Sequence, residues 1–259
     1  MPYETIIYEK ERGVATITLN RPDKLNAINS RMRDELIDAL VDVHKDEKVR
    51  ALIITGGTEM FCAGADIMDQ PGPSTLWEKL SPKRTYSYYH LIEDLGKPVI
   101  AAIAGYCLGG GLELACACDI RIAADNAKLG DAHTRLGVMG GGGSTQRLPR
   151  LIGIPRAKEL IFSGLPIDAL QAERIGLVNK VVPAAELLRA AGELAELYKQ
   201  RPPIVLKLSK AAIDEGMQMP FAQGLDFEAK CATLVGLTED YQEAISAFKE
   251  KRKPEFKGK

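Results

Sequence analysis

The sequence predicts an α/β fold, because short apolar runs of strand length alternate with longer stretches of helical periodicity. The apolar runs cover residues 6–8, 14–19, 51–55, 99–103 and 120–123. A helical pattern over residues 32–45 separates the second run from the third. Alternation of this kind favours crossover units built on a sheet. With 259 residues, the chain can bury a sizeable core in one large domain, with or without a small appendage.

From residue 151 onward the pattern becomes helical, over residues 155–163, 168–175, 184–200, 203–215 and 239–251. Apolar side chains recur at helical spacing at Ile204, Leu208, Ala211 and Ala212, which predicts one apolar face for burial between subunits. Residues 69–85 are the least regular part of the chain, because several prolines interrupt any helix there.

Composition excludes several classes of function. The net charge of −1, from 34 basic and 35 acidic residues, provides no field for nucleic acid or an anionic membrane. Five cysteines in mostly apolar surroundings suit a reducing, cytoplasmic compartment. The N-terminus shows no leader pattern, although a processed organellar protein would look the same. We expect no metal site, because Cys116 and Cys118 have the wrong spacing for a zinc knuckle.

The most informative segment is the run Gly109-Gly110-Gly111, which follows the apolar stretch 98–104 and precedes Glu113. It predicts a buried strand, a loop without side chains and a helix over about residues 111–117. Glycines let the backbone approach a ligand closely, and the helix start leaves N–H groups unpaired at the positive end of the helix dipole. The segment is therefore suited to holding developing negative charge, although tight helix packing would explain the glycines equally well.

A second segment, FCAGADI at residues 61–67, also places small residues after an apolar strand. Further motifs follow along the chain: LNRP at 19–22, LNA at 25–27, STQRLPR at 144–150, AERIGLVN at 172–179, VVP at 181–183, SAF at 246–248 and KRKP at 251–254. Together with residues 98–119 they resemble the crotonase superfamily, the enoyl-CoA hydratase and isomerase family. Several motifs in the family's order make the resemblance specific.

The resemblance implies a crotonase-like spiral of β-β-α units over residues 1–200 and a helical C-terminal region over residues 201–259 that drives trimer formation. Two trimers would stack into a hexamer. The substrate would be an acyl-CoA, with coenzyme A as part of the thioester and no separate cofactor. We expect no nucleic-acid or membrane partner.

The same resemblance assigns residues to the site. The backbone N–H groups of Ala65 and Gly110 would hold the thioester oxygen as an enolate forms. Coenzyme A would lie along Leu25, Ala27, Ala63, Asp66 and Ile67, with Gly109 also in the substrate site. Phe248 and Lys251 would reach the coenzyme of a neighbouring subunit, although the charge run 249–253 alone would favour a solvated lysine.

Hydratases of this family use two glutamates across the double bond of the substrate. Glu113 occupies the position of the first, which activates water. The second is expected within residues 129–137, where this chain has His133. An imidazolium can donate a proton to the α-carbon much as a carboxylic acid does, and Glu113 would help to keep it charged.

His133 leaves three interpretations open. The chain is a hydratase or related lyase that acts on a 2-enoyl-CoA, or another enolate-forming crotonase, such as a carbon–carbon bond hydrolase, decarboxylase or isomerase. A third interpretation is an acyl-CoA binder without turnover. Related β-diketone hydrolases pair such a histidine with an aspartate in the next loop, where this chain has only glycines 140–143. Asp131 is expected on the same face of an extended segment as His133, where it could orient the ring.

The irregular segment 69–85 contains Trp77, and Tyr86, Tyr88 and Tyr89 follow it. Buried aromatic residues usually belong to a core. In crotonases this stretch borders the acyl pocket and varies with substrate, so the resemblance gives these residues a second, functional interpretation.

Overall fold

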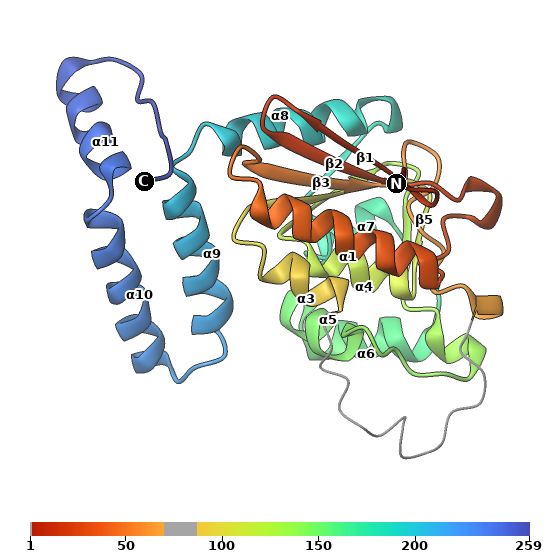
Figure 1. Ribbon diagram of the computed structural model, residues 1–259. Coiled ribbons are helices and arrows are strands. Elements are labelled where there is room, and N and C mark those ends of the chain that lie inside the picture. Colours follow the sequence, from red (N-terminus) through yellow and green to blue (C-terminus); the bar gives the residue numbers. More distant parts are fainter. Residues whose placement is uncertain (1, 70–86) are drawn as a thin grey trace.

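A six-stranded sheet forms the centre of the molecule, with strand order β1-β2-β3-β4-β6-β9 (Figure 1). The structure is a computed structural model that describes residues 2–69 and 87–259. The strands are β1 (Ile6–Glu11), β2 (Val14–Leu19), β3 (Ala51–Thr55), β4 (Val99–Ile103), β6 (Ile120–Ala124) and β9 (Lys180–Val182). Only the hairpin of β1 and β2 is antiparallel among these pairs. β3 and β4 are buried along their whole length, as parallel strands with covered faces usually are.

Helices cover both faces of this sheet. One face packs on α1 (Ser30–Lys45) and α4 (Gly110–Ala117), with α3 (Tyr88–Glu93) between them (Figure 1). The other face packs on α8 (Leu187–Lys199), whose Leu187 and Ala191 lie against Ile53 and Ile100. α1 begins where the Asn29 side chain accepts a hydrogen bond from the Met32 N–H, which caps the helix.

A second, three-stranded sheet lies beside the first, with strand order β5-β7-β8. Its strands are β5 (Tyr106–Leu108), β7 (Lys128–Gly130) and β8 (Ile167–Asp168). The chain therefore passes from strand β4 of the large sheet through β5 of the small one to α4, and from β6 through β7 onward. This repeated step is the expected spiral, and it places α4 and the segment after β7 next to each other.

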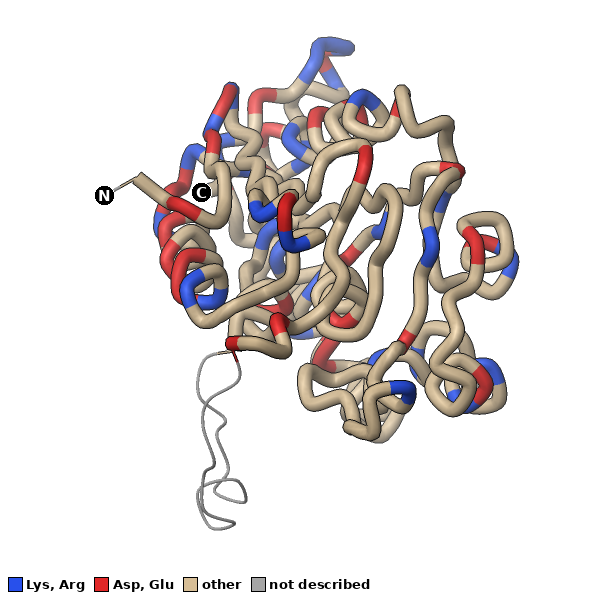
Figure 2. Tube along the Cα trace, turned by 90° about the vertical axis from the view of Figure 1, so that its right-hand side faces the viewer, with Lys and Arg blue, Asp and Glu red and all other residues tan. Residues whose placement is uncertain are grey.

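Shorter helices complete the core. These are α5 (Ser144–Ile152), α6 (Ile154–Ser163), α7 (Ala169–Arg174) and the 3-10 turns η1 (Pro22–Lys24), η2 (Ile67–Asp69), η3 (His133–Leu136) and η4 (Ala184–Glu186). None of the helices within residues 2–69 and 87–259 has the length and apolar character of a membrane span. Acidic and basic residues are interspersed along the trace, as the near-zero net charge predicts (Figure 2).

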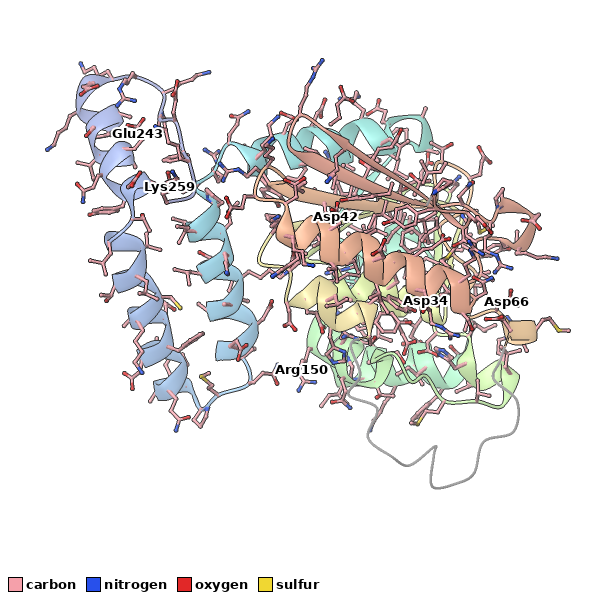
Figure 3. The ribbon with its side chains drawn as sticks, viewed as in Figure 1. Asp34, Asp42, Asp66, Arg150, Glu243 and Lys259 are labelled. Carbon is pink, nitrogen blue, oxygen red and sulfur yellow. The ribbon has the colours of Figure 1, made fainter. Side chains whose placement is uncertain are left out.

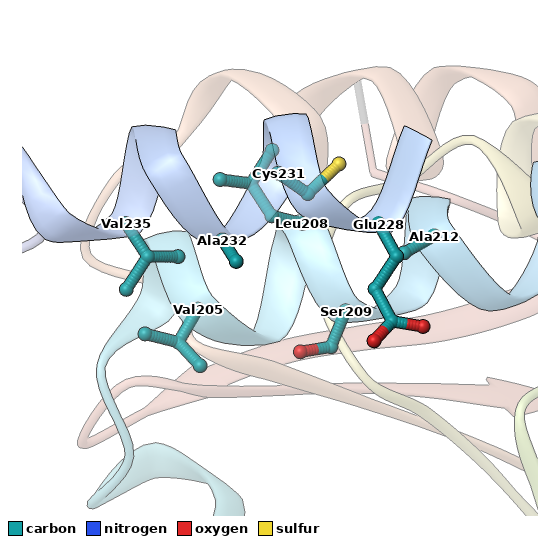
Figure 4. A pocket seen from close by; sticks show the side chains of 8 residues that line it. All are labelled: Val205, Leu208, Ser209, Ala212, Glu228, Cys231, Ala232 and Val235. Atoms are coloured by element: carbon teal, nitrogen blue, oxygen red, sulfur yellow. The ribbon is translucent and has the colours of Figure 1, made fainter. Parts of the chain in front are cut away.

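Three C-terminal helices stand beside the core: α9 (Pro203–Gly216), α10 (Phe221–Gly236) and α11 (Glu239–Glu250) (Figure 1). An ion pair between Lys210 of α9 and Asp119, 3.0 Å long, ties the first of them to the core. α9 and α10 pack on each other and leave an apolar groove that includes Leu208 and Val235 (Figure 4). No residue of α9 is buried in the single chain.

The structure corrects several expected elements. The sequence patterns did not predict α5 and α10 or the short strands β5, β7, β8 and β9. The first strand continues to Glu11, and the long helix after residue 184 starts as a 3-10 turn. The prediction that Asp131 and His133 lie on one extended segment is wrong, because His133 begins the turn η3.

Candidate active site

Two loops at one end of the large sheet pair with each other through their backbones. The N–H of Ala63 donates to the Leu25 carbonyl at 3.0 Å, and the N–H of Ile28 donates to the Gly64 carbonyl at 2.8 Å. An ion pair of 2.9 Å between Arg21 and Asp66 ties the loops together from the side. The expected coenzyme-binding residues Leu25, Ala27, Ala63, Asp66 and Ile67 therefore lie in one paired surface.

The Ala65 and Gly110 N–H groups come together where this surface meets α4. A Cβ atom on Gly110 would lie 3.3 Å from the Ala65 nitrogen, and one on Gly64 would lie 3.6 Å from the Gly110 nitrogen. Gly110 is the first residue of α4, so its N–H has no acceptor within the helix. Within residues 2–69 and 87–259, the Ala65 N–H has no backbone acceptor either. Two adjacent, unpaired donors of this kind can hold an oxyanion.

Glu113 projects from the first turn of α4 and is held by the glycine loop 140–143. Its Oε1 accepts hydrogen bonds from the N–H of Gly142 at 2.8 Å and from the N–H of Ser144 at 3.1 Å. The loop must approach this closely without side chains, because a Cβ on Gly142 would lie 2.5 Å from Oε2 and from the Tyr89 ring. The carboxylate is buried, and these bonds leave Oε2 available for chemistry.

His133 lies opposite Glu113, with its Nε2 atom 3.9 Å from Oε2. The other ring nitrogen, Nδ1, lies 2.7 Å from Oδ1 of the buried Asp131, which also accepts the His133 backbone N–H at 3.2 Å. Because an ionised carboxylate only accepts, Nδ1 carries a proton in this contact. Nε2 is therefore the ring atom that faces Glu113, and the Gly109 backbone also lies beside it.

The charges around His133 favour its protonated form. The hydrogen bond from its ring to Asp131 raises the pKa of His133 above its ordinary value, although burial opposes this shift. Burial raises the pKa of Asp131, but its hydrogen bonds with His133 and the nearness of the Ser144 hydroxyl more than offset this, so the pKa lies below the ordinary value. The pair can therefore supply a proton next to Glu113.

Tyr89 forms part of the wall between these groups. Its hydroxyl donates to the Gly110 carbonyl at 3.3 Å, and its buried ring packs on Tyr88 at a centroid distance of 4.1 Å. The Arg147 guanidinium lies 5.8 Å from the Tyr89 ring centroid and forms an ion pair with Glu93 of α3. α3 and α5 thus hold Tyr89 against Glu113 and the glycine loop.

Comparison with known proteins agrees with this geometry. Residues 9–259 match the family described as enoyl-CoA hydratase/isomerase. The chain is 44% identical to the crotonyl-CoA hydratase of Syntrophomonas wolfei, over 99% of both chains. It is 44% identical to the short-chain-enoyl-CoA hydratase of Clostridium acetobutylicum, over 98% of both.

The chain belongs to the enoyl-CoA hydratase/isomerase family. Its fold also matches a solved structure, the enoyl-CoA hydratase of Bacillus anthracis, with a TM-score of 0.92 and 42% identity. That match covers 99% of this chain and 100% of the other. The family resemblance and the crotonase-type fold expected from the sequence are therefore confirmed.

The structure brings together most, but not all, of the residues that the family resemblance indicated. Phe248 and Lys251 lie at the end of α11, on the C-terminal helices. Glu243 of the same helix lies across the molecule from Asp66 (Figure 3). α11, which carries Phe248 and Lys251, stands apart from α4 (Figure 1), so their contact with coenzyme A stays a prediction that involves a second subunit. Trp77 and Tyr86 lie outside the described residues.

The groups that hold Glu113 were not predicted from the sequence. In the sequence, glycines 140–143 show only that an aspartate is absent from this loop. In the structure, the N–H of Gly142 and the N–H of Ser144 each donate a hydrogen bond to the Glu113 carboxylate. Arg147 is visible in the sequence only as part of a family motif. Four consecutive glycines before a helix are the one signal in the sequence that could have indicated close backbone approach to a ligand or a side chain.

Proposed function

We propose that this protein hydrates 2-enoyl-CoA thioesters through an enolate. The observation that carries the proposal is the meeting of four groups at one place: the N–H groups of Ala65 and Gly110, the Glu113 carboxylate and the His133 ring. The names of the similar hydratases support the same reaction. The paired loops that contain Leu25 and Ala63 support binding of the coenzyme A part of the substrate.

Each group has a defined step. Glu113 takes a proton from a water molecule while the water oxygen forms a bond to the β-carbon. The electrons of the double bond move toward the thioester oxygen, which accepts hydrogen bonds from Ala65 and Gly110. His133 then donates the Nε2 proton to the α-carbon, and the thioester carbonyl re-forms. A proton returns from Glu113 to His133 through solvent, which restores both groups.

The His133 pair with Asp131 also favours a second candidate, hydrolytic cleavage of a carbon–carbon bond through the same enolate. A histidine with an aspartate partner can activate water, although here the partner precedes the histidine instead of lying in the next loop. Glu113, held by the glycine loop, favours hydration as the main reaction.

The test is incubation of the purified protein with crotonyl-CoA and longer 2-enoyl-CoAs while the absorbance of the conjugated thioester is followed. Hydration predicts loss of this absorbance and formation of a 3-hydroxyacyl-CoA. Loss of a β-diketone substrate without turnover of any enoyl-CoA would favour the hydrolase. Tight binding of acyl-CoA with no turnover of any thioester would identify a binding protein.

We also propose that residues 1–200 form the catalytic core and that residues 201–259 drive assembly into trimers and hexamers in a cytoplasmic enzyme. The exposed apolar side chains of the C-terminal helices, among them Phe221 and Leu237, support burial against other subunits. Assembly would also bring Phe248 and Lys251 to a neighbour's coenzyme. Sedimentation as a stable monomer at micromolar concentration would contradict this assembly.

A further inference from the structure

The loop that orients Glu113 consists of four consecutive glycines, residues 140–143. Glycine has more backbone freedom than any other residue, so such a loop keeps one conformation only where other groups fix it. Its own residues have no side chains that could pack on the core. Within residues 2–69 and 87–259, no backbone N–H donates a hydrogen bond to the carbonyls of residues 140–142. Side chains from elsewhere must therefore hold the loop.

The Arg147 side chain makes such a contact. Its Nη1 donates a hydrogen bond to the Gly142 carbonyl at 2.5 Å, and its Nε donates to the Glu93 carboxylate at 2.5 Å. The N–H on the other side of Gly142 donates to Glu113. A continuous chain of hydrogen bonds thus runs from α3 through Arg147 and the glycine loop to the Glu113 carboxylate.

The space for the guanidinium exists because residue 143 is a glycine. Gly143 has a φ of +109°, in the left-handed region that favours glycine. A Cβ atom at this position would overlap Nη1 of Arg147. The side chains of Arg147 and Glu93 are only 15% and 34% exposed, so solvent has limited access to the contact. The loop and the arginine are therefore fitted to each other.

Only an arginine can make both contacts at once. The guanidinium is planar and points its N–H groups in fixed directions, so it can bind a carboxylate and a carbonyl together. A lysine ammonium carries the same charge, but as a single point on a flexible stem. The shape of the Arg147 side chain, in addition to its charge, thus joins α3 to the loop.

We propose that Arg147 is a positioning residue for the reaction. It holds the glycine loop, and the loop holds Glu113 with its Oε2 directed toward the reacting atoms. This role rests on the proposed function, and it acts on the substrate only through Glu113. Because a misplacement of about 1 Å can lower a rate about 10²-fold, loss of the guanidinium should reduce kcat and leave coenzyme A affinity nearly unchanged.

Arg147→Ala is the direct test. Its kcat for crotonyl-CoA is expected to fall by about 10–10²-fold, while the dissociation constant for coenzyme A stays near the wild-type value. Arg150→Ala is the matched control, because Arg150 is exposed on the same helix and donates to the Gln146 carbonyl of that helix. Its kcat should not change. Equal losses in the two variants, or a loss of affinity as large as the loss of kcat, would overturn the proposal.

Chemical rescue separates positioning from general support of the fold. Guanidinium chloride, at concentrations too low to unfold the protein, should restore part of the activity of Arg147→Ala. Ammonium chloride at the same concentration matches the ionic strength but lacks the planar shape, so it should not. Arg147→Lys should stay close to Arg147→Ala in kcat. A lysine variant with the wild-type rate, or an alanine variant that guanidinium does not rescue, would contradict the proposed role.

The other end of the chain of hydrogen bonds is tested by Glu93→Ala. If Glu93 acts on the loop only through Arg147, the double variant with Arg147→Ala should be no slower than Arg147→Ala alone. Losses of kcat that multiply in the double variant would show that the two residues act independently, against a single chain.

Hydrogen exchange measured by mass spectrometry tests the anchor without any substrate. In Arg147→Ala, the N–H groups of Gly142 and Ser144 should exchange about tenfold faster than in the wild type, the effect of losing about one hydrogen bond. Arg150→Ala should exchange like the wild type. If the wild type hydrates no enoyl-CoA, the proposed function fails while the exchange rates still test the anchor. If it does hydrate them, and Arg147→Ala matches it in rate and exchange, the anchor is wrong.

Discussion

The ring of His133 is fixed by Asp131, whose Oδ1 lies 2.7 Å from Nδ1. This contact directs the opposite nitrogen toward Glu113. It also raises the pKa of His133, so the ring keeps its second proton at a higher pH than an isolated histidine does. A carboxylate in this role is a positioning residue, because it acts on the substrate only through the imidazole.

Asp131→Asn tests this positioning through pH dependence. The pKa of His133 is raised in the wild type, so its proton-donating form persists as pH rises, and removing the carboxylate charge lowers that pKa. The alkaline limb of kcat/KM for crotonyl-CoA is therefore expected to move to lower pH. A lower kcat with an unmoved limb would mean that Asp131 only supports the fold.

Glu113→Gln removes the proton acceptor while keeping the size of the side chain. Turnover is expected to fall by about 10²–10⁴-fold, the usual contribution of a general base, with coenzyme A affinity and melting temperature nearly unchanged. Glu47→Gln, at an exposed position, is the control for loss of a carboxylate. A Glu113→Gln enzyme that keeps more than about half of its activity would exclude this role.

Gly110→Val tests the oxyanion donors. The new side chain would occupy space next to the Ala65 nitrogen and the Tyr89 hydroxyl, where the thioester oxygen is expected. Loss of one donor typically lowers kcat by about 10²–10³-fold. Gly192→Ala in α8 is the control, since a Cβ there meets no atom within 4 Å and the residue lies outside the site. If coenzyme A affinity and melting temperature fall as steeply as the rate, the glycine is only structural.

Glu35 provides a prediction about stability. It accepts hydrogen bonds from the Thr5 N–H and hydroxyl, 2.8 and 2.6 Å long, and so ties the residue before β1 to α1. Burial raises its pKa, but these bonds outweigh burial and lower the pKa to about 2. A depressed pKa stabilises the fold above about pH 4.5, and this stabilisation is lost as the pH falls toward 2.

Glu35→Gln should therefore lower the free energy of unfolding by about 2 kcal/mol at pH 7. The difference from the wild type should shrink below about pH 4.5. Denaturant titrations at pH 7 and pH 3 measure both values. A difference that is equal at the two pH values would show that the charge of Glu35 does not contribute.

Local patterns were sufficient for much of the fold. The buried strands β3 and β4 are continuous apolar runs, and α1 has clear helical spacing, so their periodicity is visible in the sequence. α10 was not predicted because Gly224 and the exposure of most of its residues weaken its helical periodicity. Its packing on α9 is a tertiary contact, which no local pattern contains. β5 and β7 are only three residues long, which is too short for any periodicity to be visible.

The sequence predicted the part of the candidate site in which backbone N–H groups are the functional groups. Glycines at strand ends agree with the donors at Ala65 and Gly110 that the family resemblance implies. The contacts of Glu113 with Gly142 and Ser144 join residues about thirty positions apart, so no local pattern contains them. Asp131 meets His133 through a turn and not through the extended segment expected from the sequence.

The most direct test of the central proposal is the rate of crotonyl-CoA hydration by His133→Ala, compared with the wild type at the same enzyme concentration. If His133 donates the proton to the α-carbon opposite Glu113, kcat/KM falls by about 10²-fold or more while the melting temperature and coenzyme A affinity are kept. An unchanged rate would show that His133 is structural and that hydration proceeds without it.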